Sequence, residues 1–344
     1  MKRVFVIAEA GSNWRAGTPA RDLAMSHALI DAAAEAGADA VKFQTYRAET
    51  VYVPNAGTSD YLSENGIRRS IIEIFKDLAM PYEMIPMLAS YCKKRKIEFM
   101  SSVFSEADFR AVDPYVKRHK IASYEITYFG LIELAARSKK PTILSTGASS
   151  SREIDWAVAY YKKHGGRELS LMQCTAKYPA PLSALNLRVI PQLIERYRIP
   201  VGLSDHSRNP EIGPVAAVAL GATLIEKHYT LDNHLPGPDH AFAVTACELK
   251  EMVRSIRECE QTLGSGHKVV LPEERELRFY AQRAVQAIRP IRMGEIFEEG
   301  ANIAVLRPGR QRQGVHPKFL DRISGRRAKR LIPLGDGIQK DDYA

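Results

Sequence analysis

Short apolar runs alternate with longer amphipathic segments along most of this chain, and the alternation repeats eight times. Strands that alternate with helices form parallel sheets, and eight such units have the count and size of a closed barrel. The pattern therefore predicts an α/β fold, a (β/α)8 TIM barrel. A doubly wound open sheet is the alternative. The expected strands are Val4–Ala8, Ala40–Thr45, Glu98–Val103, Lys120–Tyr124, Pro141–Thr146, Leu169–Thr175, Val201–Asp205 and Thr223–His228.

The expected helices lie between these runs and after the last of them. They are Ala20–Ala36, Tyr82–Lys96, Glu106–Val112, Ile154–Lys163, Leu187–Tyr197, Glu211–Leu220 and Cys247–Leu263. Beyond them, Gly264 opens a polar segment, and short apolar runs at Ala284–Ile291 and Ile303–Leu306 follow among Gly and Pro residues. We expect a TIM-barrel catalytic domain over 1–264, a linker over 265–283 and a small β-rich domain over 284–344.

Composition excludes several classes of protein. The chain has 344 residues, of which 45% are hydrophobic and 26% charged, as in ordinary globular enzymes. No run of apolar residues has the length of a membrane span. The four cysteines are scattered and are expected to be reduced core thiols, which favours the cytoplasm. The net charge of +9 comes without a nucleic-acid motif, so the basic tail is interpreted as a solvated face.

Polar side chains gather at the ends of the expected strands. Barrel enzymes carry their reactive groups at the carboxyl ends of the strands, so these side chains should share one mouth. Alternation along each strand places the members of each pair on the same face. The pairs are Lys42 with Gln44, Ser123 with Glu125, Ser204 with His206 and Glu226 with His228, and Glu9 closes the first strand.

These side chains indicate the chemistry of the ligand. Lys42 and Lys120, together with the hydroxyls of Ser102, Ser123, Ser145 and Ser204, suit a phosphate and a carboxylate. His206 and His228 end neighbouring strands and could hold one metal ion with positions left open for water and substrate. Glu9, Glu125, Glu226 and Asp239 are candidates for proton transfer and for binding sugar hydroxyls. The residues alone predict a metal-assisted barrel enzyme for a phosphorylated acid and leave the reaction open.

Seven motifs in order resemble the sialic acid (N-acetylneuraminate) synthase family, which includes the legionaminic and pseudaminic acid synthases and a spore-coat polysaccharide relative. The resemblance covers nearly the whole chain, and Gly237–Asp239 and Arg307–Gly309 extend it. The motifs are Ile7–Asn13 (IAEAGSN), Val41–Thr45 (VKFQT), Lys120–Glu125 (KIASYE), Ile143–Gly147 (ILSTG), Cys174–Pro179 (CTAKYP), Gly202–His206 (GLSDH) and Glu226–Thr230 (EKHYT).

The resemblance implies a TIM barrel with a C-terminal antifreeze-like (SAF) domain, working as a domain-swapped homodimer. It implies a transferase of polysaccharide biosynthesis that condenses phosphoenolpyruvate with an N-acetylated hexose, either N-acetylmannosamine or a 6-deoxy diacetamido sugar. The product would be a nonulosonic acid, released with phosphate. By the resemblance, phosphoenolpyruvate is held by Lys42, Ser102, Lys120, Ser123, Ser145 and Ser204, and manganese or magnesium by His206 and His228. The sugar is held by Gln44, Asn65, Tyr178, Glu226, Asp239 and the partner chain's equivalent of Arg307.

Two other functions compete with this reading. A metal-dependent sugar aldolase or isomerase would keep the barrel and the metal but would need no phosphoenolpyruvate. A Schiff-base version of it requires Lys42 or Lys120 to be neutral. A non-catalytic carbohydrate-binding scaffold would instead leave the paired strand ends and both histidines without a purpose.

Overall fold

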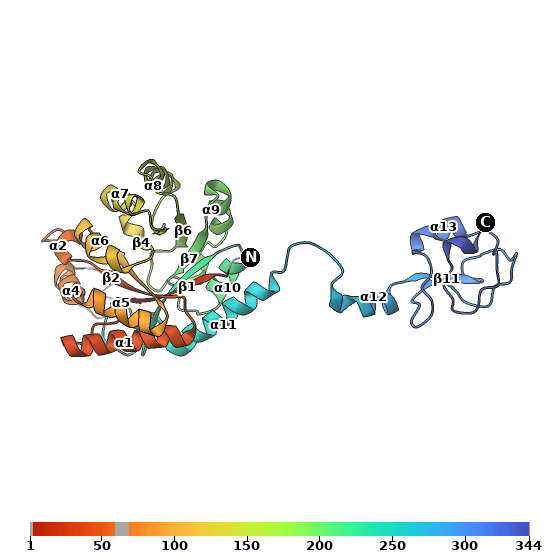
Figure 1. Ribbon diagram of the computed structural model, residues 1–344, viewed down its shortest axis with the longest axis horizontal. Helices are drawn as coiled ribbons and strands as arrows, with labels where there is room; N and C mark the ends of the chain where they lie inside the picture. The colour runs from red at the N-terminus through yellow and green to blue at the C-terminus, as the bar shows by residue number, and fades with distance from the viewer. Residues whose placement is uncertain (1–2, 59–68, 344) are drawn as a thin grey trace. The chain divides into compact units, whose positions relative to one another are not determined.

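Eight parallel strands close into a barrel in the first part of the chain (Figure 1). Each strand pairs with the next in sequence, and β1 also pairs with β8. This last pairing confirms the predicted TIM barrel and rules out the doubly wound open sheet, in which the two outer strands stay apart. The strands are β1 (Phe5–Gly11), β2 (Ala40–Thr45), β3 (Glu98–Val103), β4 (His119–Ile121), β5 (Thr142–Ser145), β6 (Leu169–Cys174), β7 (Val201–Asp205) and β8 (Leu224–Thr230).

The computed structural model describes residues 3–58 and 69–343, and the chain divides into two units, Met1–Gly264 and Ser265–Ala344. Helices surround the strands of the first unit (Figure 1). They are α1 (Pro19–Ala36), α2 (Ala48–Val51), α4 (Ile71–Leu78), α5 (Met84–Arg95), α6 (Glu106–Val112), α7 (Phe129–Ser138), α8 (Ser151–Lys163), α9 (Val189–Tyr197), α10 (Ile212–Ala219) and α11 (Ala246–Thr262). The sequence analysis missed α2, α4 and α7, and also β9 (Val244–Thr245), a short strand that pairs with β8.

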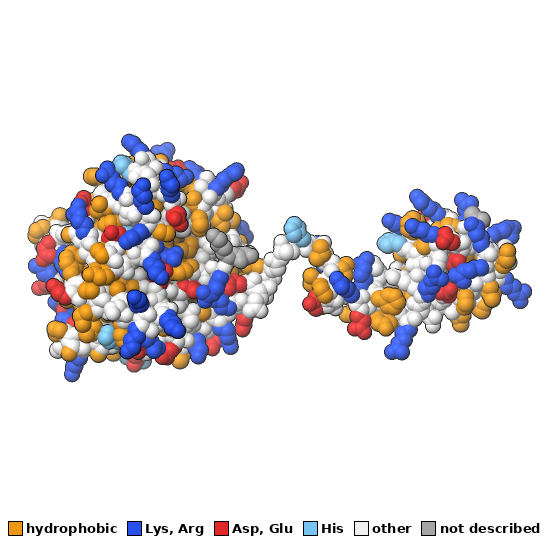
Figure 2. Space-filling model, viewed as in Figure 1, with side chains coloured by type: hydrophobic (Ala, Val, Ile, Leu, Met, Phe, Trp, Pro, Cys, Tyr) orange, Lys and Arg blue, Asp and Glu red, His pale blue; other side chains and the backbone are white. Residues whose placement is uncertain are grey.

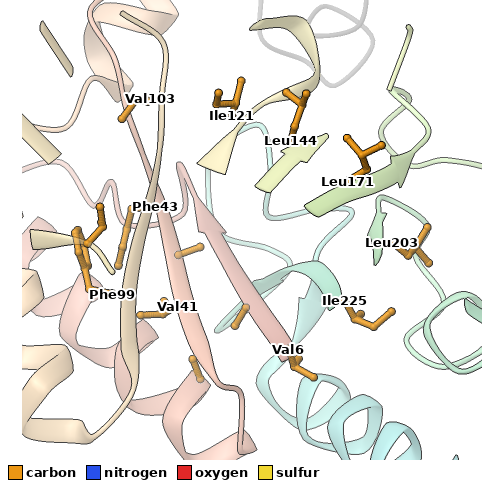
Figure 3. Packing of buried hydrophobic residues seen from close by; sticks show 14 of the residues in the cluster. Val6, Val41, Phe43, Phe99, Val103, Ile121, Leu144, Leu171, Leu203 and Ile225 are labelled. Carbon is orange, nitrogen blue, oxygen red and sulfur yellow. The ribbon is translucent and has the colours of Figure 1, made fainter. Parts of the chain in front are cut away.

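Alternation along the strands separates an apolar layer from the barrel interior. On β2, Val41 and Phe43 belong to the main core between strands and helices, where Figure 3 shows them with Val6, Leu203 and Ile225 from other strands. Lys42 and Gln44, one residue away, line a cavity inside the barrel. A separate small cluster of Ile7, Ala40, Met100, Ile143, Met172 and Leu224 packs in that interior. Because apolar side chains are buried on both faces of the strands, the hydrophobic effect favours their association. The inner face carries polar side chains at the carboxyl ends of the strands.

Strand register sets which polar groups meet. Glu9 on β1 is paired with Lys42 on β2 and with His228 on β8. Side chains at paired positions of parallel strands point to the same face, so these three form one row across three strands. A second row runs from Gln44 to Ser102 and Lys120 across β2, β3 and β4.

Three expectations need correction. The strand predicted over Lys120–Tyr124 is only β4, because the chain turns at once into a 3-10 helix, Ser123–Glu125, closed by a Glu125 N–H bond to the Ala122 carbonyl. Cys247 is exposed near the start of α11, so only Cys92, Cys174 and Cys259 are buried thiols. The segment 265–283, expected as a linker, contains a helix that was not predicted, α12 (Arg275–Ala281).

The second unit has its own core. Strand β10 (Ala284–Ala287) pairs antiparallel with β11 (Ile303–Leu306), and a short helix, α13 (Leu320–Ile323), follows. Val285, Phe297 and Ile332 are among the buried residues of this core. Lys and Arg side chains are spread over the visible face of both units (Figure 2). Among the residues that the structure describes, no helix has both the length and the apolar character needed to cross a membrane.

Candidate active site

One cavity of about 710 Å³ collects nearly every residue that the sequence analysis selected. The selected residues on its wall are Glu9, Lys42, Gln44, Ser102, Lys120, Ser123, Glu125, Ser145, Tyr178, Ser204, His206, Glu226, His228 and Asp239. They come from the carboxyl ends of the strands and the segments that follow, where barrel enzymes work. A second cavity, of about 780 Å³ beside α8 and α9, has none of them on its wall.

Two lysines and two glutamates form a buried charge network inside the cavity. Lys42 Nζ lies 2.6 Å from Glu9 Oε2 and 3.7 Å from Glu226 Oε1, and Lys120 Nζ lies 3.4 Å from Glu226 Oε1. Lys42 also donates to Ser102 Oγ at 2.9 Å, and Gln44 Nε2 donates to Glu9 Oε1 at 2.9 Å. Each charge therefore has an opposite charge beside it, which offsets the cost of burial.

The pKa values of the two carboxyls move in opposite directions. Burial raises the pKa of Glu9 above its usual value, although Lys42 and His228 pull it down. Burial also acts to raise the pKa of Glu226, but Lys120 and Lys42 outweigh it and lower the pKa to about 2. Glu226 is therefore an ionised acceptor at neutral pH, whereas Glu9 takes up a proton more readily than an ordinary glutamate. A pair of carboxyls separated in this way can play different roles in proton transfer.

The serine hydroxyls lie around the same mouth in different bonding states. Ser204 Oγ donates to Glu226 Oε1 at 3.2 Å, and Ser123 Oγ accepts from the Gly147 N–H at 2.9 Å. Ser145 Oγ is buried and has no hydrogen-bond partner among the described residues. A buried hydroxyl without a partner is costly, so this group is available for a ligand oxygen.

The two histidines stand together at one side of the cavity. Their ring centroids are 5.5 Å apart, and the ring of Tyr178 stacks on His206 at 4.2 Å. His206 Nδ1 lies 2.8 Å from the Thr175 carbonyl, which can only accept, so Nδ1 carries the proton and Nε2 keeps a lone pair. Burial and the neighbouring His228 lower the pKa of His206 to about 3, so the ring is neutral at neutral pH.

The donors around the histidines fit a divalent metal ion with open positions. His228 Nδ1 and Glu226 Oε2 are buried and have no hydrogen-bond partner among the described residues. Residues 3–58 and 69–343 contain no group of three His, Cys, Asp or Glu side chains placed to hold a metal. Two imidazoles and no thiolate suit a catalytic ion that keeps positions for water and substrate, rather than a closed structural site.

Lys227 lies between Glu226 and His228 in sequence but points to the other face of β8. Its buried ammonium is 2.6 Å from Asp205 Oδ2 and donates to the Asn209 carbonyl at 2.8 Å. Asp205 in turn accepts from the Ser207 N–H at 2.8 Å. These bonds hold the residues on both sides of His206. Lys227, which faces away from the cavity, therefore positions the backbone that carries the His206 side chain.

Asp239, from the segment after β8, approaches the end of β1. It accepts from the Ser12 N–H at 3.2 Å and from Ser12 Oγ at 3.1 Å. Gly11 has φ of +52°, and a Cβ there would come within 2.5 Å of Asp239 Oδ2. Glycine is required at this position for both conformation and space.

Two selected residues are not placed in this cavity. Asn65 lies outside the described residues. Arg307 is exposed directly after β11 in the second unit, and no carboxylate pairs with it among the residues that the structure describes there. Conversely, the sequence analysis missed one part of the wall, formed by Tyr46, Val51, Tyr52, Ile71, Ile74, Phe75, Leu78 and Phe104. The capping pair Ser70 and Glu73, followed by apolar residues at helical spacing, was the available signal for α4.

Comparisons with known proteins identify the family of the chain. Residues 29–268 match the NeuB family and residues 282–344 match the SAF domain. The chain is 42% identical to the spore coat polysaccharide biosynthesis protein SpsE of Bacillus subtilis, over 98% of this chain and 93% of that protein. It is 35% identical to a pseudaminic acid synthase of Campylobacter jejuni, over 99% and 97%. A solved N-acetylneuraminic acid synthetase of Leptospira borgpetersenii, in complex with citrate, is 34% identical with a TM-score of 0.71, over 80% of this chain and 90% of that one.

The carboxyl of Glu125 gives the cavity a group that titrates near neutral pH. Burial raises its pKa to about 7, against a smaller lowering by its backbone hydrogen bond and by Lys120. The folded state therefore binds an extra proton between the unfolded and folded pKa values, and stability declines as pH rises through that window. Relative to wild type, Glu125→Gln should gain about 2 kcal/mol in free energy of unfolding between about pH 5 and about pH 8.

Urea unfolding followed by tryptophan fluorescence measures this effect on the barrel alone, because Trp14 and Trp156 are the chain's two tryptophans. Glu83→Gln, at an exposed position, is the matched control and should keep the wild-type dependence of stability on pH, because it retains Glu125. A parallel pH profile for Glu125→Gln and wild type would contradict the assigned titration.

Proposed function

The chain belongs to the NeuB family, and on that basis we propose that it condenses phosphoenolpyruvate with an N-acetylated hexose. The chain is an enzyme, a transferase that forms a carbon–carbon bond. The proposed acceptor is N-acetylmannosamine or a 6-deoxy diacetamido sugar, and the proposed products are a nonulosonic acid and phosphate. The observation that carries the proposal is one cavity in which buried lysines and hydroxyls meet a pair of buried histidines.

Phosphoenolpyruvate is assigned to the lysine and serine side of the cavity. Lys42 and Lys120 project from β2 and β4, with Ser102 on β3 between them. Ammonium and hydroxyl donors on three neighbouring strands can bind phosphate and carboxylate oxygens by charge-assisted hydrogen bonds. Ser123, Ser145 and Ser204 complete the set, and the unpartnered Ser145 hydroxyl supports a ligand oxygen at that point.

His206 and His228 are the proposed ligands of a divalent ion, manganese or magnesium. When bound, such an ion supplies Lewis-acid polarisation of the sugar's aldehyde oxygen. The protein keeps His206 neutral by burial and orients its ring through the Thr175 carbonyl. Gln44, Tyr178, Glu226 and Asp239 are the proposed sugar contacts within the cavity.

The proposed reaction joins the two substrates, adds water and releases phosphate. The enol carbon C3 of phosphoenolpyruvate bonds to the aldehyde carbon, whose oxygen becomes a hydroxyl by taking a proton. Water adds to the resulting cation at C2 and loses a proton. Phosphate then leaves with the electrons of the C2–O bond while the C2 hydroxyl gives up its proton, which gives the 2-keto acid. Glu9, Glu125 and Glu226 are the candidate proton carriers, and Glu125 has the pKa closest to neutral pH.

Phosphate release that requires both phosphoenolpyruvate and sugar tests this function. The mass of the product should equal the sum of both substrates plus water minus phosphoric acid. Lys120→Met should raise the KM for phosphoenolpyruvate roughly tenfold or more, because one charge-assisted contact is lost, and should leave the KM for sugar nearly unchanged. Lys117→Met, at an exposed position, is the control. Turnover of pyruvate with the sugar, without phosphoenolpyruvate, would favour the aldolase instead.

Removal of metal should abolish activity, and manganese should restore it. His206→Ala should lose most turnover while its thermal unfolding stays close to wild type, because an open catalytic site contributes little to folding. His234→Ala, whose side chain is 95% exposed, is the control and should stay active. Full activity in excess chelator would overturn the proposed role of His206 and His228.

A domain-swapped homodimer is proposed from the resemblance, with Arg307 entering the partner's site. A guanidinium offers a planar fork of donors suited to an acetamido carbonyl or to hydroxyls. The exposed Arg307 directly after β11 is free to make such contacts.

The proposed location is the cytoplasm. The four cysteines form no disulfide, as is usual for proteins of that compartment.

Mixing two inactive variants tests the swap. His206→Ala and Arg307→Ala are combined under conditions that allow subunits to exchange. If tails cross, a mixed dimer joins the intact barrel of the second variant to the intact tail of the first, and one of its two sites regains activity. Exchange confirmed by mass, without recovered activity, would show that each tail acts on its own barrel or not at all.

A further inference from the structure

Lys227 is a buried cation that the proposed reaction does not use. Its side chain is 1% exposed, and its ammonium lies 2.6 Å from Asp205 Oδ2. It also donates to the carbonyl of Ser207 and, at 2.8 Å, to the carbonyl of Asn209. An ammonium has three N–H donors, and all three find acceptors in one turn, 205–209. The turn contains one of the two histidines of the cavity and folds around the ammonium.

Neighbouring residues shield the pair of Lys227 and Asp205 from solvent. The Asp205 side chain is 0% exposed, and a Cβ added to Gly213 of α10 would come within 2.9 Å of its Oδ2. The carboxylate also accepts from the N–H of Ser207 at 2.8 Å and from its hydroxyl at 3.1 Å. Displacement of either charge would leave buried polar groups unpaired, which is costly. The turn therefore has one strongly favoured arrangement.

The backbone pairing between β7 and β8 stops just before the two histidines. Its last pair is Asp205 with Lys227. His228 still belongs to β8, which continues to Thr230, whereas His206 comes one residue after the end of β7. The sheet therefore fixes the backbone of one histidine, and the position of the other depends on the turn.

Lys227 connects the turn to the strand. Its backbone immediately precedes His228 in β8, and its ammonium holds the residues on both sides of His206. The ring of His206 has a second anchor, because its Nδ1 lies 2.8 Å from the Thr175 carbonyl. The two imidazoles are 5.5 Å apart between ring centroids. This separation thus depends on a side chain that faces away from the cavity.

We propose that Lys227 is a positioning residue for the divalent ion. By holding His206 at a set distance from His228, it sets the affinity of the site for manganese. This inference rests on the proposed function, in which the two imidazoles hold that ion. Metal ligands have to stay within about 0.5 Å of their productive arrangement, and changes to the groups that orient them cost roughly tenfold to a hundredfold in metal affinity.

Loss of Lys227 alone would leave the Asp205 carboxylate buried and unpaired, so the test removes both charges. The double variant combines Asp205→Asn with Lys227→Met. We expect its dissociation constant for Mn²⁺ to rise at least tenfold, measured without substrates from the electron paramagnetic resonance signal of free Mn²⁺. At saturating manganese, the KM for phosphoenolpyruvate should stay close to wild type, because the lysines and hydroxyls proposed to bind it are unchanged.

A matched double variant at the opposite end of the barrel shows whether loss of an ion pair alone explains the effect. Arg257 donates to the Val4 carbonyl at 2.7 Å and pairs with Asp39 at 2.9 Å, next to the amino ends of β1 and β2. Asp39→Asn with Arg257→Met should also lower the Tm, but should keep the wild-type affinity for Mn²⁺. An equal loss of affinity in both double variants would overturn the inference, because general loosening of the barrel would then be the cause.

Ser207→Ala serves if the double variant at Lys227 does not fold. It keeps both charges and removes a hydroxyl 3.3 Å from the ammonium, so the affinity for Mn²⁺ should fall severalfold. Ser26→Ala is its control, because this buried hydroxyl donates to the Asp22 carbonyl within α1. Wild-type affinity in the folded double variant, or in Ser207→Ala where that variant fails to fold, would refute the role of Lys227. Absence of Mn²⁺ binding to the wild-type protein would instead overturn the proposed metal site itself.

Discussion

Glu9 meets Lys42 on one side and His228 on the other because β1 closes the barrel between β2 and β8. The cavity depends on this pairing. A shift of one residue along either neighbour would turn its polar side chains out into the layer of Val41, Phe43 and Ile225, where they would find no partner. The apolar packing outside the strands therefore protects the register, and the register brings the charges inside together.

Burial of two ammonium and two carboxylate groups is costly unless their charges balance. Lys42 lies between Glu9 and Glu226, and Lys120 shares Glu226 with it. Removal of one member leaves another buried charge uncompensated, so these groups support each other as well as a ligand. The same network explains why the pKa of Glu226 falls while that of Glu9 rises. Burial is the largest single effect on both carboxyls, but Glu226 lies near both lysines, which together outweigh it, whereas Glu9 has Lys42 beside it and is repelled by Glu226.

Much of the barrel could be predicted because apolar and polar residues alternate along the strands, and this alternation distinguishes the two faces of each strand. In Val41-Lys42-Phe43-Gln44 the apolar residues pack outside and the polar residues line the cavity, as alternation requires. The same rule turns Lys227 away from Glu226 and His228. Its partners Asp205 and Asn209 lie on another strand and loop, however, and no local pattern names them. Helix α7 was missed, and Tyr128 before it provides no side-chain cap that would have marked its start.

Contacts made by the segments after the strands were the least predictable part of the site. The approach of Asp239 to Ser12 and Gly11 joins positions more than two hundred residues apart, and depends on how the chain returns after β8. The apolar residues of α4 on the cavity wall are similar, since Phe75 packs on Tyr46 and Tyr52, which lie outside this helix. Strand ends therefore carry most of the polar groups of the cavity, and the segment between β2 and β3 adds an apolar part of its wall. Local patterns along a strand name the first set, whereas the second depends on how separate segments pack on one another.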